Sequence, residues 1–418
     1  MRNETKDKRQ EVTNKSESVY SKYMFMKKVV FKVFISLFIL SAGSVMSQTR
    51  LWNMEKLSKA KSSDPGIASD ILKDADKALT KSITTVMDKE MTPPSGDKHD
   101  YMSAGRYWWP DPKNPTGPYI RKDGVVNHEI DKLDRGPLGM IAKNVTSLSL
   151  AYYFTSDDRY AAKAVNNLRI WFINPKTRMN PNMNYGQTIP GRNKGLGRGE
   201  GIIDTYSFVD MLDGIELLKG STKFTQNDQL ALKNWFTSYL EWMMTSPIGN
   251  EEYTAKNNHG TAFDVQATRY ALFVGKDDIA RKYCNDFAAL RLFTQIEPDG
   301  SQPMELARTT ALGYSTFNLT HILDMCHLAK SLNIDIYHAS STDGRSISKA
   351  LEFLSQFAGK PQSQFPYKQI KDWDAVQTKL CWQLYRADKL NSTPVFEKYY
   401  RGKISDSDKD KDSNLMVY

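Results

Sequence analysis

The chain has 418 residues, and its 40% hydrophobic and 25% charged fractions are those of a folded globular protein, which excludes intrinsic disorder for the whole sequence. The formal net charge is +9, but nine basic and four acidic side chains in residues 1–47 contribute +5 of it and leave +4 for the rest. This mild charge suits an acidic substrate, whereas the sequence has no basic helix or RNA-binding motif, so we expect no nucleic-acid partner.

The cysteines and histidines do not form a metal-binding pattern. Cys284, Cys326 and Cys381 lie far apart, without a C-x-x-C motif, which argues against a disulfide framework and a zinc site. The scattered histidines form no H-E-x-x-H or comparable motif, so we expect no metal and no cofactor. The aromatic residues are plentiful, with 8 Trp and 21 Tyr, and such rings stack on sugars as well as filling cores.

Residues 1–47 are predicted to be an N-terminal extension with a secretory signal. Met26-Lys27-Lys28 leads into the apolar run 29–40, and small residues follow before Gln48. The run is too short for a comfortable transmembrane helix, so we expect cleavage near Gln48 and no stable membrane insertion afterwards. An uncleaved anchor is the alternative. The mature protein is expected to be periplasmic or secreted by a bacterium.

The rest of the chain is predicted to be one helical domain, 48–404, followed by a flexible tail, 405–418. Two helices are expected within 50–92, separated at Pro65-Gly66. Further helical segments are predicted at 138–155, 158–173, 202–219, 225–245, 259–274, 276–293, 309–331, 345–358 and 371–388. No convincing run of strands is present. Helix after helix with short turns predicts an all-α fold, an (α/α) toroid of helical hairpins with long loops lining a cleft.

Two long loops interrupt this helical pattern. The first loop, 93–137, is rich in Pro and Gly and contains Arg106-Tyr107-Trp108-Trp109, which is expected to form a wall that stacks on sugars and binds carboxylates. Packing of this loop onto the protein body is the alternative. The second loop, 174–201, is rich in Asn, Gly and Pro, and we expect it to line the cleft through Tyr185, Gln187 and Arg192.

A cluster of polar residues opens the helix predicted at 259–274. Asn257-Asn258-His259-Gly260 stands immediately before an apolar-periodic run. Unpaired N–H groups and the helix dipole make such an end favourable for a bound carboxylate. Asn258 can donate through its amide, and His259 can donate or accept a proton. The alternative is a simple helix cap followed by a loop histidine.

A second polar cluster contains Glu305, Arg308 and Tyr314. An arginine is a fixed bidentate partner for a carboxylate, and a tyrosine can transfer a proton if neighbouring cations lower its pKa. Arg308 and Tyr314 are six residues apart and point in different directions on an uninterrupted helix. They converge on one cleft only if the intervening backbone bends at Gly313 or forms a loop.

These two clusters in this order resemble the alginate lyase superfamily. Asn257-Asn258-His259-Gly260, then Glu305-Leu-Ala-Arg308 and Tyr314, are similar to polysaccharide lyase family 5 and to the related family 38 of glucuronan and alginate lyases, over roughly residues 95–330. The resemblance implies an α/α toroid with Asn258, His259, Arg308 and Tyr314 as catalytic residues. We expect the substrate-binding residues to be Arg106, Tyr107, Trp108, Trp109, Tyr185, Gln187, Arg192, Asn257 and Glu305.

The implied reaction is β-elimination on a 1,4-linked uronate polymer, an acidic polysaccharide. Asn258, His259 and Arg308 neutralise the substrate carboxylate, and Tyr314 moves the protons at C5 and O4. In mannuronate and glucuronate H5 and O4 share one face, so one residue can serve both; in guluronate they do not, and His259 becomes the candidate base. The sequence leaves open which uronate is cleaved, whether cleavage is internal or terminal, and the oligomeric state.

Two other functions remain open at this point. A glycoside hydrolase on the same kind of toroid would need two acids across a cleft, drawn from Glu200, Asp204, Asp299 and Glu305. A non-catalytic glycan-binding protein would use the exposed aromatic residues alone.

Overall fold

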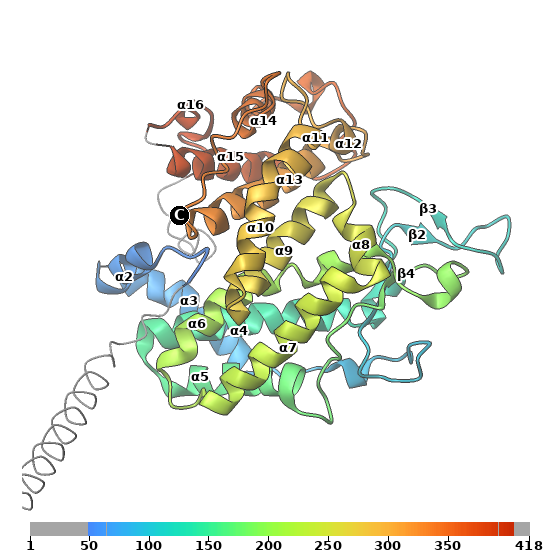
Figure 1. The fold of residues 1–418 in the computed structure, drawn as a ribbon, viewed down its shortest axis with the longest axis vertical. Helices are drawn as coiled ribbons and strands as arrows, with labels where there is room; N and C mark the ends of the chain where they lie inside the picture. Colours follow the sequence, from blue (N-terminus) through green and yellow to red (C-terminus); the bar gives the residue numbers. More distant parts are fainter. Residues whose placement is uncertain (1–48, 64, 392, 405–418) are drawn as a thin grey trace, which may run out of the picture. The chain divides into compact units, whose positions relative to one another are not determined.

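The computed structural model describes residues 49–63, 65–391 and 393–404, so the predicted signal and the predicted tail lie outside the described residues. Helices dominate these ranges (Figure 1). The larger ones are α2 (Met54–Ser63), α3 (Pro65–Thr80), α4 (Arg135–Thr155), α5 (Asp158–Leu168), α6 (Phe208–Leu217), α7 (Gln226–Thr245), α9 (Asn258–Val274), α10 (Asp277–Phe287), α13 (Ala311–Lys330), α14 (Ile347–Ser355) and α15 (Trp373–Leu390). Short helices are α8 (Pro247–Tyr253), α11 (Phe293–Gln295), α12 (Pro303–Leu306) and α16 (Glu397–Tyr400).

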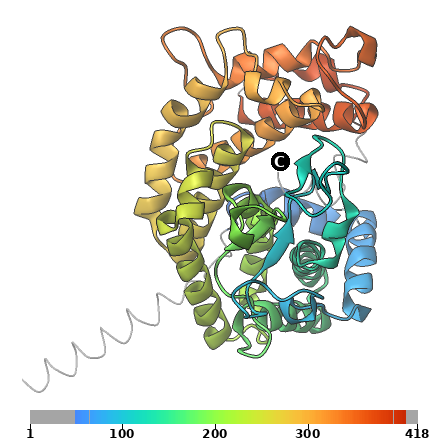
Figure 2. The ribbon, with the colours of Figure 1, turned by 90° about the vertical axis from the view of Figure 1, so that its right-hand side faces the viewer.

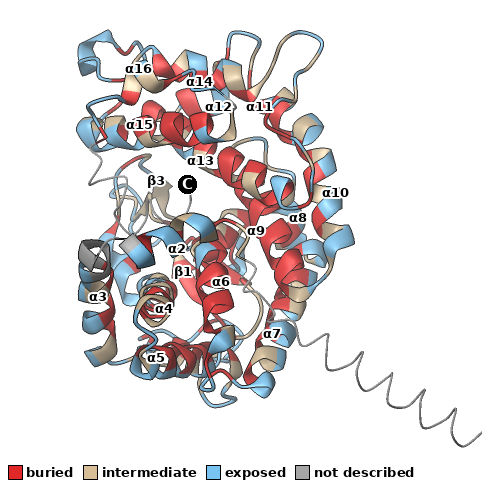
Figure 3. Ribbon diagram, turned by 90° about the vertical axis from the view of Figure 1, so that its left-hand side faces the viewer, coloured by how far each residue is buried: buried red, intermediate tan, exposed pale blue. Residues whose placement is uncertain are grey.

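The long helices form an inner and an outer layer. Helices α4, α6, α9, α13 and α15 pack one against the next as the inner layer. The outer helices cover them: α3 and α5 pack on α4, α7 and α10 on α9, and α14 on α13. Burial follows this order, because α9 and α13 are buried along most of their length while α3 and α10 expose one face (Figure 3). This alternation is the (α/α) toroid that the sequence predicts.

Local signals explain where the inner helices begin and end. The Asn257 side chain accepts a hydrogen bond from the backbone N–H of His259 and so caps the N-terminus of α9. Gly275 ends α9 with a left-handed φ of 82°, which a residue with a side chain adopts only with strain. In the outer layer, Thr225 and Asp228 form a reciprocal capping box at the start of α7.

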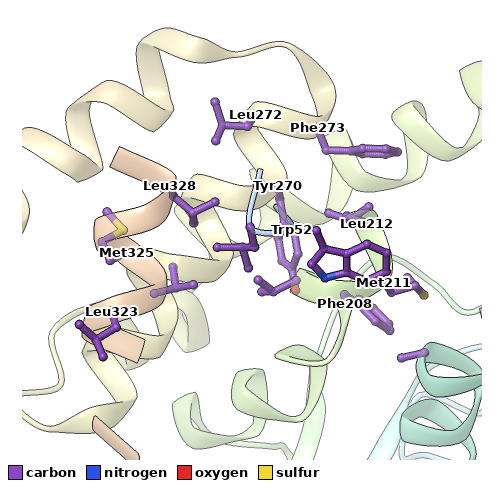
Figure 4. Close-up of a cluster of buried hydrophobic side chains, with 14 of the residues drawn as sticks. Trp52, Phe208, Met211, Leu212, Tyr270, Leu272, Phe273, Leu323, Met325 and Leu328 are labelled. Atoms are coloured by element: carbon purple, nitrogen blue, oxygen red, sulfur yellow. The ribbon is translucent and has the colours of Figure 1, made fainter. Parts of the chain in front are cut away.

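Apolar side chains from three inner helices meet in the core. Phe208 from α6, Tyr270 from α9 and Leu323 from α13 belong to one buried cluster, and Trp52 from the N-terminal segment joins them (Figure 4). The Asp213 carboxylate, fully buried, accepts the backbone N–H groups of residues 50–52 and a hydrogen bond from Arg269. Truncating a ring such as Phe208 to Ala is expected to cost about 3–5 kcal/mol of folding free energy.

The structure also contains elements that the hydrophobic pattern did not predict. Helix α8 is additional, and the predicted helix 276–293 divides into α10, a π-helical turn at Ala288–Leu292 and α11. The predicted helix 158–173 similarly ends in a π-helical turn, Arg169–Ile173. Wider turns keep the same apolar face buried, so periodicity alone does not distinguish them from a continuous α-helix.

The two long loops are joined to each other by short strands. Strand β1 (Met102–Ala104) of the first loop pairs in parallel with β4 (Tyr185–Thr188) of the second. Within the first loop, β2 (Trp108–Trp109) pairs antiparallel with β3 (Ile120–Arg121). Strands β2, β3 and β4 lie together on one side of the helical body (Figure 1), and Figure 2 faces that side.

Candidate active site

The N-terminal ends of the inner helices meet the two loops around a cavity of about 680 Å³, which we call the main cavity. Arg135 begins α4, Asn258 and His259 open α9, and Tyr314 lies in the first turn of α13. Several helix dipoles therefore present their positive ends to one space. Such an arrangement favours a bound anion.

The charged side chains that line the main cavity are mostly cationic. They include Arg106, Arg121, Arg135, Arg198, Arg308 and Lys379, in addition to His259. Glu200 is the one acidic residue among the described lining residues, and it is paired with Arg198 at 2.6 Å. A polymer with a carboxylate on every sugar is complementary to this lining.

Asn258 is held by Glu305. Its backbone N–H and its side-chain Nδ2 group donate to the Glu305 carboxylate at 2.7, 2.8 and 3.0 Å. Glu305 is only 2% exposed and burial raises its pKa, so it lies behind Asn258 instead of facing the substrate space as expected. The Asn258 Oδ1 atom has no partner among the described residues. The amide hydrogens that the sequence analysis assigned to the substrate carboxylate are thus already bound to Glu305.

His259 is paired with a buried carboxylate. Its Nδ1 lies 2.7 Å from Glu252 Oε1, and the Glu252 side chain is 1% exposed. Burial disfavours the imidazolium, but the Glu252 carboxylate outweighs burial and raises the pKa of His259 above its usual value. Because Nδ1 faces Glu252, Nε2 points away from that carboxylate and is a cationic donor whenever the ring is protonated.

Arg308 connects the first loop to the end of α12. Its Nη2 and Nε donate to the two Asp123 oxygens at 2.6 and 3.2 Å. Its guanidinium carbon lies 3.7 Å from the centroid of the Tyr314 ring. Residues 307–310 are not helical. The backbone between Arg308 and Tyr314 therefore includes the loop that lets both side chains face one cavity. Nη1 of Arg308 makes no hydrogen bond with any part of the chain that the structure describes.

The Tyr314 hydroxyl donates to the hydroxyl of Tyr107 at 3.0 Å. Burial raises the pKa of Tyr314, although the Arg308 guanidinium opposes this effect. This corrects the expectation that cationic neighbours lower the pKa of Tyr314, because desolvation of the phenolate is the larger effect. Tyr314 is therefore a neutral phenol near neutral pH, ready to donate a proton.

The remaining predicted substrate-binding residues divide into two groups. Tyr107, Trp108, Gln187, Asn257 and Arg106 line the main cavity. Tyr185, Trp109 and Arg192 do not: Tyr185 is 8% exposed and packs with Met102 and Leu133, and the Trp109 indole donates to the Val125 carbonyl. Arg192 lies over the outer side of the Trp108 ring, 4.9 Å from its centroid.

The sequence analysis missed several residues that shape the site. Asp123 and Glu252 hold Arg308 and His259, and Arg135, Arg198 and Lys379 add charge to the main cavity. Glu252 lies seven residues before His259, and no motif in the surrounding sequence marks it as a functional residue. Arg198 stands in the glycine-rich part of the second loop. The several basic residues in that loop were the one sequence signal that could have indicated a role for Arg198 in the site.

The four acids considered for hydrolysis do not form a pair across the cavity. Glu200 lines the main cavity, but Asp204 is 8% exposed and accepts hydrogen bonds from Tyr101 and Ser103. Asp299 lies in a turn before Gly300, and Glu305 is bound to Asn258. The expected arrangement of two carboxyl groups facing one substrate bond is thus missing from these four residues.

The described residues show neither a metal-binding cluster nor a membrane-spanning helix. Within residues 49–63, 65–391 and 393–404, no group of three or more His, Cys, Asp or Glu side chains is arranged to hold a metal ion. In the same ranges, no helix combines the length and the apolar character that a membrane span needs.

The chain is similar to known alginate lyases. The sequence model of the family described as alginate lyase matches residues 85–364. The crystal structure of an alginate lyase from Bacteroides ovatus is 53% identical, with a TM-score of 0.86 over 89% of this chain and 99% of that chain.

More distant structures share the fold. A histidine-to-alanine variant of alginate lyase A1-III complexed with a tetrasaccharide is 15% identical, with a TM-score of 0.60 over 90% of this chain and 97% of that chain. Alginate lyase A1-III from Sphingomonas species A1 is also 15% identical, with a TM-score of 0.53 over 84% and 94% of the two chains. None of the curated proteins searched matches the chain. The chain belongs to the alginate lyase family and is a polysaccharide lyase.

Proposed function

We propose that the enzyme cleaves a 1,4-linked uronate polymer, either the mannuronate of alginate or glucuronan, by β-elimination. The observation that carries this proposal is the meeting of His259, Arg308 and Tyr314 at one cation-lined cavity. The product would carry a C4=C5 double bond on its new non-reducing end. The name of the Bacteroides ovatus relative and the family description support alginate as a substrate.

The first chemical requirement is neutralisation of the substrate carboxylate, because the C5 proton is poorly acidic beside a charged group. Two donors are available for it: the protonated imidazole of His259, and Nη1 of Arg308, which the bonds to Asp123 leave open. Asn258, fixed by Glu305, positions the start of α9 and offers Oδ1 as an acceptor. Charge stabilisation of this kind often makes the largest contribution to catalysis.

The second requirement is proton transfer at C5 and O4. Tyr314 is a neutral phenol, so donation to O4 is the step that its ground state suits directly. To act first as the base Tyr314 must lose its own proton, and the Tyr107 hydroxyl, which accepts its hydrogen bond at 3.0 Å, can relay that proton by releasing its own to solvent. On mannuronate or glucuronate, Tyr314 serves both steps from one face; on guluronate, His259 would have to remove H5.

A substrate panel tests the proposed function. The enzyme is incubated with polymannuronate, glucuronan, polyguluronate and a neutral glucan, while the ultraviolet absorbance of the new double bond and the number of reducing ends are followed. Elimination raises both signals on a uronate polymer. Reducing ends without absorbance would indicate hydrolysis, and neither signal would indicate binding alone; either result would contradict the proposal.

We also propose that the enzyme acts outside the cytoplasm. The support is the basic, apolar and small-residue order of residues 26–47, which precedes the described domain. Mass spectrometry of periplasmic or secreted enzyme is expected to find a first residue near Gln48. Mature protein that retains Met26 would contradict cleavage.

A further inference from the structure

We infer that a second cavity, the side cavity, binds a further uronate unit of the same polymer that occupies the main cavity. This inference rests on the proposed function and extends its binding site. The side cavity has a volume of about 790 Å³. Its lining includes Arg106, Arg135, His128, Lys371, Val125 and Ile370.

Two arginines belong to both cavities. Arg106 and Arg135 line the main cavity and the side cavity, so both residues lie at the junction, where the two cavities adjoin. Arg106 makes no hydrogen bond or ion pair through its side chain with any described residue, and its Nε is buried without a partner. Arg135 reaches Asp204 at 3.5 Å through Nε, while its Nη1 is buried and also lacks a partner in the described part of the chain.

Such buried N–H groups are costly when they stay unpaired, particularly on a cation. A carboxylate is a ligand that satisfies unpaired guanidinium N–H groups well, because its oxygens accept paired hydrogen bonds. A uronate polymer supplies one carboxylate for each sugar. A chain that passes the junction can therefore place one carboxylate between Arg106 and Arg135 and the next sugar in the side cavity.

The charges beyond the junction continue the same pattern. Lys371 is exposed and forms no ion pair within the described ranges. His128 and Asp131 also line this cavity, and their side chains are hydrogen-bonded to each other at 2.9 Å. Helix α4, which is 21 residues long, starts at the wall of this cavity with Arg135 and Gly136. The positive end of its dipole adds to the attraction for an anion.

The shape of the side cavity also suits a sugar. Val125 and Ile370 are both 46% exposed, and aliphatic surface of this kind packs against the C–H faces of a pyranose. A Cβ atom added to Gly136 or Gly139 would meet no atom within 4 Å, so the first turns of α4 leave room for a ligand. Gly124, whose φ is 78°, brings the first loop close to Thr309 and Ile370 and so forms the opposite wall.

Two variants test the inference by different means. Gly139→Trp fills the side cavity from α4, and Gly139→Ala is its control, since the small side chain fits and alanine favours the helix. Lys371→Ala removes charge from the cavity, and Lys368→Ala removes an exposed lysine three positions away that lines neither cavity. For each enzyme, kcat/KM is measured on mannuronate trisaccharide and hexasaccharide by absorbance.

We expect the ratio of hexasaccharide to trisaccharide kcat/KM to fall about tenfold in Gly139→Trp and at least about threefold in Lys371→Ala, since one lost contact of this kind changes affinity by such factors. Both controls keep the wild-type ratio. Trisaccharide turnover shows that each variant is folded. A wild-type ratio in either test variant would overturn the inference.

The result is separable from the proposed function. A wild-type enzyme that produces no unsaturated uronate on any polymer contradicts elimination, and calorimetric binding of the hexasaccharide then tests the side cavity without cleavage. In that experiment, Gly139→Trp must weaken hexasaccharide binding relative to Gly139→Ala. Equal dissociation constants would overturn the inference by themselves.

Discussion

Arg308 joins two distant parts of the site, because its guanidinium lies 3.7 Å from the centre of the Tyr314 ring while it binds both oxygens of Asp123. Asp123 comes from the first loop, and it also accepts hydrogen bonds from the backbone and hydroxyl of Thr309. The loop that carries Tyr107 and Trp108 is thereby fixed to the segment before α13. The position of Arg308 over Tyr314 thus depends on a residue from another part of the chain.

The Asp123 contact predicts a loss of turnover when it is weakened. Asp123→Asn keeps the size of the side chain but removes its charge, so Arg308 loses its partner and its fixed place over Tyr314. We expect kcat to fall by about 10- to 100-fold, within the range that misplaced catalytic groups produce. Asp111→Asn, on the same loop, is the control. Steady-state kinetics check this, and an unchanged kcat in Asp123→Asn would show that Asp123 does not position Arg308.

Asp123 also gives a pH dependence of stability. Burial raises the pKa of Asp123, but hydrogen bonds from Arg308 and Thr309 outweigh this and hold it well below its usual range. A depressed folded-state pKa means that the stabilisation is present above the unfolded value of about 4 and is lost as the pH falls through the folded value. The free energy of unfolding of Asp123→Asn is expected to fall less than that of the wild type as the pH is lowered, because the variant has no ionised Asp123 to lose. Denaturant titrations at several pH values would measure this difference.

The His259–Glu252 pair predicts the alkaline side of the activity profile. Charged His259 neutralises the substrate carboxylate, and activity is lost as the pH rises through its pKa. Glu252 raises that pKa despite burial, so Glu252→Gln should move the alkaline limb of kcat/KM to lower pH by about one unit, typical of a lost charge partner. Glu241→Gln, at an exposed position, is the control. A limb that does not move would exclude His259 as the group that titrates.

Glu305 and Asn258 are expected to act as one unit. Glu305→Gln replaces an acceptor by an amide that cannot receive all three hydrogen bonds from Asn258, and we expect activity to fall at least about tenfold. Asn258→Ala in the Glu305→Gln background should add little further loss, because residues in one hydrogen-bonded network are not additive. Fully additive losses in this double-mutant cycle would contradict the arrangement.

The paired tryptophans are expected to differ. Trp108 lines the main cavity, while Trp109 does not and is held by its bond to the Val125 carbonyl. Trp108→Ala should lower kcat/KM on polymer by about fivefold, which corresponds to roughly 1 kcal/mol for one stacking ring. Trp109→Ala, the matched variant, should have the smaller effect on kcat/KM. A larger loss of kcat/KM in Trp109→Ala than in Trp108→Ala would contradict this assignment and indicate that Trp109 contacts the substrate.

Much of the fold followed from the sequence, because apolar spacing, caps and glycines are local signals. The start of α9 at Asn258 is an example, with Asn257 as its cap. The contacts of the site were not accessible in this way. Asp123 contacts Arg308, and Glu252 contacts His259, only in the folded protein. No sequence motif around either acid predicts these pairs.

The misplaced residues have a physical explanation as well. In a regular strand Tyr185 and Gln187, two residues apart, would share one face, but Gln187 has a left-handed φ of 50° that breaks the alternation in β4. Gln187 therefore lines the cavity while Tyr185 packs with Met102 and Leu133. The pKa of Tyr314 depends on the balance between burial and one nearby guanidinium, and composition carries no information on that balance. The irregular backbone at Gln187 and the depth of burial of Tyr314 are both visible only in the three-dimensional structure.

The most direct test of the mechanism is the turnover of Tyr314→Phe on polymannuronate and glucuronan. This variant removes one hydroxyl and keeps the ring beneath Arg308, so the fold and substrate binding should change little. If Tyr314 transfers the protons, kcat falls at least roughly 100-fold with a nearly unchanged KM. A folded Tyr314→Phe enzyme that forms the unsaturated product at close to the wild-type rate would contradict the account and assign the proton transfer to another residue.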